Sequence, residues 1–265
     1  MLRARLDEVL GPLASDGPVA HRYLLCRSGD VGSELPYELR FDDQRVSGAA
    51  AGWAMVDSVV HDLNRRVVDA SPHLLLHAGG VAGDGRAVAL PGQMEAGKTT
   101  LTAGLVRAGL GYLTDEALAL DRETLLVQPY PKPLSIDPGA WALFPELAPL
   151  PAPADEGYEY VQWQVPATAI RPGAVAGPCP VVAVVFPRYE AGADTLLEPV
   201  GRAEALVELA RNTFRFKERG ASELDLLAQL ARGAECYRLT MGGLAAAVDL
   251  VAGLLGVVPE RELAR

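Results

Sequence analysis

Residues 92 to 99 of this chain read Gly-Gln-Met-Glu-Ala-Gly-Lys-Thr and fit the pattern G-x-x-x-x-G-K-[ST]. From the composition of the chain, about 0.002 matches to this pattern are expected by chance. Such a loop binds phosphate through backbone N–H groups at the start of a helix, so it has to follow a strand and precede a helix. The motif, which we call the phosphate loop, therefore predicts a strand, a loop and a helix in this order, and a nucleotide site.

The residues around the phosphate loop agree with this expectation. Residues 86 to 90 have the pattern of a short buried strand, and residues 99 to 108 form a helical pattern with Leu101, Leu105 and Val106 on one face. We expect Lys98 to contact the β- and γ-phosphates and the Thr99 hydroxyl to bind Mg²⁺. A glycine turn with an incidental lysine is the alternative. The residues expected to bind the nucleotide are Gly92, Gln93, Met94, Glu95, Ala96, Gly97, Lys98, Thr99 and Thr100.

The composition excludes several other classes of protein. The 265 residues are 49% hydrophobic and 22% charged, which is ordinary for a globular protein with a large core. The net charge of −10 argues against a nucleic-acid or anionic membrane surface, because such surfaces need clustered Lys and Arg. The three cysteines have neither disulfide-framework nor zinc-site spacing. A charged N-terminal stretch and the lack of a long apolar run predict a cytoplasmic protein without membrane contact.

The pattern of apolar residues predicts two domains. We expect residues 1 to 70 to form an accessory domain and residues 71 to 265 to form the phosphate-loop domain. In the first we expect an amphipathic segment at 2–10, strands at 21–26 and 37–41, and a helix at about 51–68.

The second domain alternates strands and helices. Strands at 74–78 and 87–90 around a glycine-rich turn predict a hairpin that leads into the phosphate loop. Further strands are expected at 112–120, 124–127, 181–186, 195–200 and 235–240, and further helices at 202–212, 222–232 and 243–255. The proline-rich segment from 145 to 153, with 154–157, predicts a mobile loop.

A pair of carboxylates, Asp115 and Glu116, follows Thr99 after 16 residues. Transfer of a phosphoryl group to a hydroxyl needs one carboxylate for the metal and one to accept the proton, and two adjacent carboxylates can divide these roles. An exposed turn of charged residues is the alternative, and the spacing alone does not separate the two.

The segments 76–78, 89–101 and 109–116 together resemble the catalytic domain of HPr kinase/phosphorylase and its relatives. That family has a histidine on the strand before the phosphate loop and an acidic pair about 16 residues after it. The segments 129–136 and 185–190 also resemble HPr-kinase-related proteins that occur near peptide-modification genes. The resemblance covers about residues 73 to 255 and implies an α/β fold, with a mixed sheet of the HPr kinase and phosphoenolpyruvate carboxykinase type behind a small α+β N-terminal domain.

The resemblance implies a role for each matching residue. Lys98 matches the phosphate-binding lysine, and Thr99 and Glu116 match the metal-binding residues. Asp115 matches the aspartate that accepts the proton from the substrate serine. His77 matches a family histidine, and a hydrogen-bonded strand histidine is its alternative.

The chain departs from the family pattern in two ways. Met94-Glu95 stands where the family usually has Ser-Gly, and a carboxylate beside polyphosphate is unfavourable unless it faces away or pairs with a cation. The segment that supports the reverse, phosphorylase reaction is not recognisable, so only a kinase is expected. Lys132, Arg215 and Lys217 are candidates for additional positive charge, with a solvated helix end as the alternative for the last two.

These observations predict an ATP- and Mg²⁺-dependent kinase acting on a hydroxyl group. The expected acceptor is a serine of a peptide or small protein, and the nearest rival is a kinase for a small-molecule hydroxyl. A nucleotide-gated binding protein with reduced catalysis is the alternative from a different class. By analogy with the family, the chain is also a candidate homo-oligomer.

Overall fold

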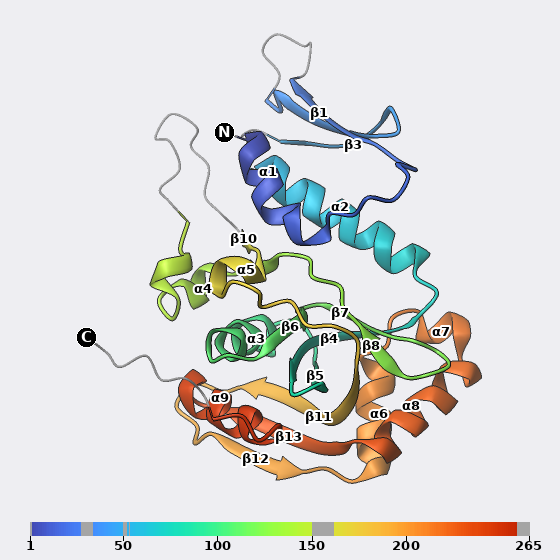
Figure 1. Ribbon diagram of the computed structural model, residues 1–265, viewed down its shortest axis with the longest axis vertical. Helices are drawn as coiled ribbons and strands as arrows, with labels where there is room; N and C mark the ends of the chain where they lie inside the picture. The colour runs from blue at the N-terminus through green and yellow to red at the C-terminus, as the bar shows by residue number, and fades with distance from the viewer. Residues whose placement is uncertain (1, 28–33, 50–51, 53, 150–161, 259–265) are drawn as a thin grey trace. The chain divides into compact units, whose positions relative to one another are not determined.

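The computed structural model describes residues 2–27, 34–49, 52, 54–149 and 162–258 (Figure 1). The chain divides into two compact units. The small unit comprises Met1–Ala70 and Lys132–Pro166, and the large unit comprises Ser71–Pro131 and Ala167–Arg265. A boundary at residue 70 therefore exists, but residues 132–166 group with the N-terminal segment rather than with the segments on either side of them.

The small unit contains an antiparallel sheet of three strands, in the order β1 (Tyr23–Arg27), β2 (Tyr37–Phe41) and β3 (Gln44–Ala49). Helices α1 (Leu2–Leu10) and α2 (Ala54–Ala70) supply apolar side chains to a core built around Leu39, Met55 and Val59. The predicted helix and the two predicted strands of this segment are confirmed, the helix and the first strand with ends shifted by a few residues. The amphipathic segment at 2–10 forms α1, and β3 was not predicted.

Residues 132–166 add a second, smaller sheet to this unit. Strand β9 (Leu134–Ile136) pairs with β10 (Trp163–Val165), and the short helices α4 (Pro138–Trp141) and η2 (Pro145–Leu147) lie between them in sequence. The Arg5 guanidinium group lies 4.0 Å from the centre of the Trp163 ring and donates a hydrogen bond to the Gln164 carbonyl group. Most of the predicted mobile loop, residues 150–157, lies outside the described residues.

The large unit is built on a mixed sheet of eight strands. Seven strands follow the order β12-β13-β11-β5-β4-β7-β8, and β6 pairs with β4 beside β7. Strand β11 runs parallel to β5 and β13, and the other pairs are antiparallel. The strands are β4 (Leu74–Gly83), β5 (Arg86–Pro91), β6 (Gly111–Thr114), β7 (Ala117–Leu120), β8 (Leu126–Gln128), β11 (Cys179–Tyr189), β12 (Leu196–Pro199) and β13 (Glu235–Met241).

Helices cover both faces of this sheet (Figure 1). Helices α6 (Arg202–Arg211) and α8 (Ala221–Gly233) pack side by side, and their Leu209, Leu227 and Leu230 join the sheet residues in one core. Helices α3 (Lys98–Arg107) and α9 (Leu244–Gly253) pack against each other and against β4 and β13. The short helices α5 (Ala167–Ile170) and α7 (Phe216–Arg219) complete the unit. The α/β class expected from the sequence is therefore present.

The strand expected at residues 112–120 is in fact two strands. β6 ends at Thr114 and β7 begins at Ala117, so the acidic pair interrupts the ladder. The remaining strands and helices predicted for this unit are confirmed, with different ends. Within the part of the chain that the structure describes, no helix is both long and apolar enough to cross a membrane.

Candidate functional site

Strand β4 brings the phosphate loop and the acidic pair to the same place. Its hairpin with β5 aligns Ala78 with Pro91, so the phosphate loop begins beside His77, whose carbonyl group accepts a 3.2 Å hydrogen bond from the Gly92 N–H group. On the other edge of β4, the Ala78 N–H group donates a 2.9 Å bond to the Glu116 carbonyl group. Two segments that are far apart in sequence thus flank a single strand.

The phosphate loop has the backbone shape of an anion-binding turn. The Ala96 N–H group donates a 3.3 Å bond to the Gln93 carbonyl group, and Glu95 and Gly97 have φ angles of 65° and 86°. Left-handed residues in a loop before a helix turn successive N–H groups toward one point, where they can bind an anion. Gly97 is also the residue before α3, and a Cβ atom there would lie 2.6 Å from the Met241 side chain. The end of the Met241 side chain can move, so it is the left-handed φ of 86° that favours glycine at this position.

Lys98 is buried, with 7% of its surface exposed, although it is charged in its usual state. Its Nζ atom donates a 2.8 Å hydrogen bond to the carbonyl group of Gln93, within the phosphate loop. Burial lowers the pKa of Lys98, and the negative charges of Asp115 and Glu116 partly offset that effect. The Gln93 carbonyl group thus holds the ammonium group at the phosphate loop.

The Thr99 hydroxyl group and the Asp115 carboxylate lie next to each other. Oγ1 of Thr99 donates a 3.3 Å bond to Oδ2 of Asp115, whose side chain is buried with 3% exposure. Oδ1 of the same carboxylate accepts a 3.0 Å bond from the hydroxyl group of Tyr112. Burial, followed by the charge of Asp115, raises the pKa of Tyr112 well above its usual value, so the tyrosine stays a donor. Tyr112 was not predicted as a site residue, because in the sequence it belongs to an apolar strand.

His77 and Glu116 lie close enough to these groups to act on them electrostatically. The pKa of His77 is lowered, first by burial and then by the positive charge of Lys98, while Glu116 and Asp115 act in the opposite direction. The His77 ring packs edge-on against Phe214, with ring centres 5.7 Å apart. The structure therefore brings together all four residues that were predicted as catalytic: His77, Lys98, Asp115 and Glu116.

A second residue that the sequence did not reveal is Asn212, at the end of α6. Its Oδ1 atom accepts a 2.8 Å bond from Nε2 of Gln93 in the phosphate loop, and its Nδ2 atom donates a 2.8 Å bond to the Glu208 carbonyl group. Only 4% of Asn212 is exposed. The two residues are 119 positions apart, so no local pattern could have linked them.

The two unusual residues of the phosphate loop, Met94 and Glu95, are both exposed, and Met94 is 82% exposed. Glu95 has the left-handed backbone that glycine adopts most easily, and glycine is what the related pattern has at this position. The Glu95 carboxylate stands at the loop surface rather than in the core.

The three basic candidates lie in different surroundings. Arg215 donates a 3.2 Å bond to the Ser71 carbonyl group and also has a left-handed backbone, while Lys217 is exposed on α7. Lys132 belongs to the small unit, where its buried Nζ atom donates a 3.0 Å bond to the Pro133 carbonyl group.

The oxygen atoms at this site suit a Mg²⁺ ion that is also bound by phosphates and water. They suit less well a metal ion whose ligands all come from the protein. Among the described residues, no group of three His, Cys, Asp or Glu side chains could hold a metal ion. Mg²⁺ in nucleotide sites is usually bound by one or two protein oxygens together with phosphates and water. Thr99 and Asp115 offer such a pair, 3.3 Å apart.

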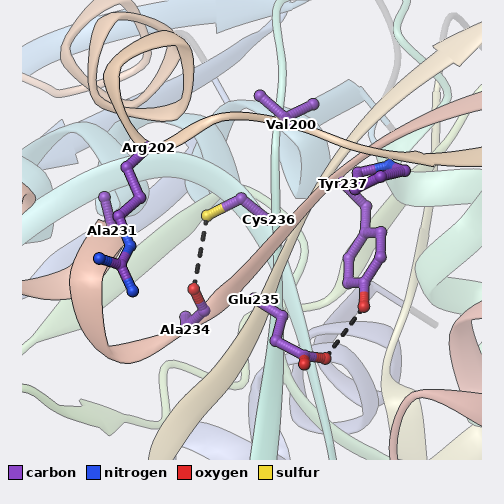
Figure 2. A pocket seen from close by; sticks show the side chains of 8 residues that line it. Val200, Arg202, Ala231, Ala234, Glu235, Cys236 and Tyr237 are labelled. Atoms are coloured by element: carbon purple, nitrogen blue, oxygen red, sulfur yellow. Dashed lines mark hydrogen bonds between the residues drawn. The ribbon is translucent and has the colours of Figure 1, made fainter.

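A shallow pocket of 280 Å³ lies elsewhere in the large unit (Figure 2). It is formed at the start of β13 and of α6, where Cys236 donates a 3.7 Å bond to the Ala234 carbonyl group and the Tyr237 hydroxyl group donates a 2.9 Å bond to Glu235. Because β13, β11 and β5 are parallel, the phosphate loop lies at the opposite ends of these strands. The pocket is therefore separate from the candidate site.

The chain was compared with known protein families and with curated protein sequences. No family model and no curated sequence matched it. The assignment of function consequently depends on the geometry described above.

Proposed function

We propose that this chain is an ATP- and Mg²⁺-dependent kinase that transfers the γ-phosphoryl group to a hydroxyl group. The observation that carries the proposal is the 3.3 Å contact between Thr99, the last residue of the phosphate loop, and Asp115. A buried carboxylate next to the hydroxyl residue of the loop suits a phosphoryl-transfer site, because such a site has to hold a metal and receive a proton at one place.

Each residue has a definite task under this proposal. The N–H groups at the start of α3 and the Lys98 ammonium group bind the β- and γ-phosphates. Mg²⁺, when bound, would neutralise charge on the same phosphates, with the Thr99 hydroxyl group and a carboxylate as its protein ligands. Asp115 accepts the proton of the attacking hydroxyl group, and Glu116 serves the metal, as the resemblance to HPr kinase implies.

Asp115 has a geometry suited to the role of base. One of its oxygens is engaged by Tyr112 and the other by Thr99, so the carboxylate is fixed in orientation before a substrate arrives. A carboxylate that is held by two hydroxyl donors needs little rearrangement during proton transfer. The same contact with Thr99 also fits a metal-binding role for Asp115, so the two carboxylates have to be separated by experiment.

The fold that we propose is that of the HPr kinase and phosphoenolpyruvate carboxykinase type. The mixed sheet of the large unit, with β4 between the phosphate loop and the acidic pair, supports it. The proposed acceptor is a serine of a peptide or small protein. A small-molecule hydroxyl and a role as a nucleotide-gated binding protein are the competing functions, and the exposed Glu95 beside the phosphates favours the second of these.

One experiment tests these functions together. The full chain is incubated with γ-labelled ATP and Mg²⁺, first with serine peptides and small proteins encoded near its gene, and then with a set of hydroxy metabolites. Lys98→Ala serves as the inactive control. We expect label on a peptide serine. Label only on a metabolite would identify the rival kinase, and tight ATP binding without any transfer would identify the nucleotide-gated binding protein.

A further inference from the structure

Three hydrogen bonds connect the end of α6 to the ammonium group of Lys98. Nδ2 of Asn212 donates to the Glu208 carbonyl group at 2.8 Å, Nε2 of Gln93 donates to Oδ1 of Asn212 at 2.8 Å, and Nζ of Lys98 donates to the Gln93 carbonyl group at 2.8 Å. Gln93 is thus tied at both ends. Its side chain is held by Asn212, and its carbonyl group holds Lys98.

The main chain of Asn212 is anchored as firmly as its side chain. Its carbonyl group accepts a 2.6 Å bond from the His77 N–H group, and the His77 carbonyl group accepts from Gly92, the first residue of the phosphate loop. Asn212 therefore reaches the loop by two routes. One runs through β4 to Gly92, and the other runs through the side chain of Gln93.

Only an amide side chain satisfies both partners of Asn212. The Glu208 carbonyl group, which also accepts a 3.2 Å bond from the Asn212 N–H group, takes a side-chain donor here. The Gln93 amide, which also donates a longer 3.5 Å bond to the Arg211 carbonyl group, takes a side-chain acceptor. A carboxylate in place of the amide would face the Glu208 carbonyl oxygen with no proton to donate, and a serine would be too short to reach both. Because Asn212 is buried, an unmet partner would cost more than it would at the surface.

We propose that Asn212 is a positioning residue for the phosphate loop. It fixes the side chain of Gln93 and, through the Gln93 carbonyl group, the position of the Lys98 ammonium group before phosphate binds. In this role Asn212 acts through Gln93 rather than through a contact with nucleotide or substrate. It acts by keeping the loop in its binding shape before the ligand arrives, which reduces the ordering cost of binding. This inference rests on the proposed function in that the loop has to bind nucleotide.

A double-mutant cycle on nucleotide affinity tests it. The dissociation constant of Mg·ATP is measured by calorimetry for the wild-type full chain, Asn212→Ala, Gln93→Ala and the double variant. Each single variant should bind about threefold to tenfold more weakly, the range of one net hydrogen bond. The double variant should bind no more weakly than the weaker single variant, because both changes remove the same bond.

Two further variants separate positioning from folding. Asn212→Ser keeps a donor for the Glu208 carbonyl group but cannot reach Gln93, so it should fold and still lose affinity as Asn212→Ala does. Thr213→Ala is the matched control, because Oγ1 of Thr213 donates a 2.8 Å bond to the Leu209 carbonyl group at the same helix end rather than to the phosphate loop. This control should lower the thermal midpoint and leave the dissociation constant unchanged.

The outcomes distinguish this inference from the function on which it rests. A wild-type chain that does not bind Mg·ATP would overturn the proposed function and the inference with it. A wild-type chain that binds, with losses that multiply in the double variant or with Asn212→Ser binding normally, would overturn the role of Asn212 alone.

Discussion

The hydroxyl oxygen of Thr99 lies 3.3 Å from Oδ2 of Asp115. This contact joins the end of the phosphate loop to the break between β6 and β7, two places that the chain reaches 16 residues apart. It exists because β4 pairs with β5 on one edge and with β6 and β7 on the other. The carboxylate that was singled out by its spacing from the loop therefore has a direct contact with it.

Lys98→Ala should abolish phosphoryl transfer and leave the large unit folded. The lysine places its charge on the phosphates in the transition state, and the loss of one such contact lowers the rate by about 10² to 10³. Turnover is measured beside circular dichroism and the thermal midpoint. A folded variant that retains most of its rate would contradict the assignment of the phosphate loop.

The two carboxylates can be separated by amide substitutions. Asp115→Asn should nearly eliminate transfer while preserving Mg·ATP binding, because the amide keeps the shape but cannot accept the proton. Glu116→Gln should instead weaken the dependence on Mg²⁺. Calorimetry and turnover are measured for both variants. If Asp115→Asn loses nucleotide affinity and Glu116→Gln does not, the roles are reversed and Asp115 is the metal-side residue.

Tyr112→Phe should lower the free energy of unfolding by about 1.5 to 3 kcal/mol, the range for a hydrogen bond to a charged group. It should also reduce turnover, because Asp115 loses one of the donors that orient it. Tyr23→Phe is the matched control, since its hydroxyl group donates a 2.8 Å bond to Asp62 in the small unit. The control should be destabilised and keep its turnover per folded molecule. An equal loss of turnover in both variants would argue against a special role for Tyr112.

Glu95→Gln should tighten Mg·ATP binding. The removal of one carboxylate near the phosphates is worth about 1 kcal/mol in water, or about fivefold in the dissociation constant, and the gain should shrink as salt is added. Asp84→Asn is the control, because Asp84 is also exposed with a positive φ of 49° but lies in the hairpin turn between β4 and β5. Weaker binding by Glu95→Gln would instead show that the carboxylate takes part in the site.

His77 should titrate below its usual pKa of about 6.5, because burial and the charge of Lys98 both oppose its protonation. A lowered pKa in the folded state means that the unfolded chain binds more protons. The contribution of His77 to the free energy of unfolding is therefore fully present above the pKa of the unfolded chain, and it is lost as the pH falls through the pKa of the folded chain. Imidazole NMR signals measure the midpoint. Lys98→Ala should raise it, and a midpoint that does not move would disprove the coupling.

The sequence by itself determined the parts of the site that depend on local pattern. Residue types and spacing could locate the phosphate loop, its strand and helix, the hairpin β4–β5 and the acidic pair. Each of these is a pattern within a short stretch of the sequence. The position of Lys98 at the start of α3 follows from the motif alone.

Tertiary structure decided the contacts between these parts. The pairing of Gln93 with Asn212, across 119 positions, depends on the register of β4 against Thr213 and on where α6 ends. The role of Tyr112 depends on the break between β6 and β7, and the grouping of residues 132–166 with the N-terminal segment depends on packing between distant elements. Apolar periodicity states which face of a strand or helix is buried, but it does not state against which partner, because many partners satisfy the same hydrophobic pattern. Strand register and the close packing of the whole core select the partner. Neither of them can be deduced from the sequence of one segment alone.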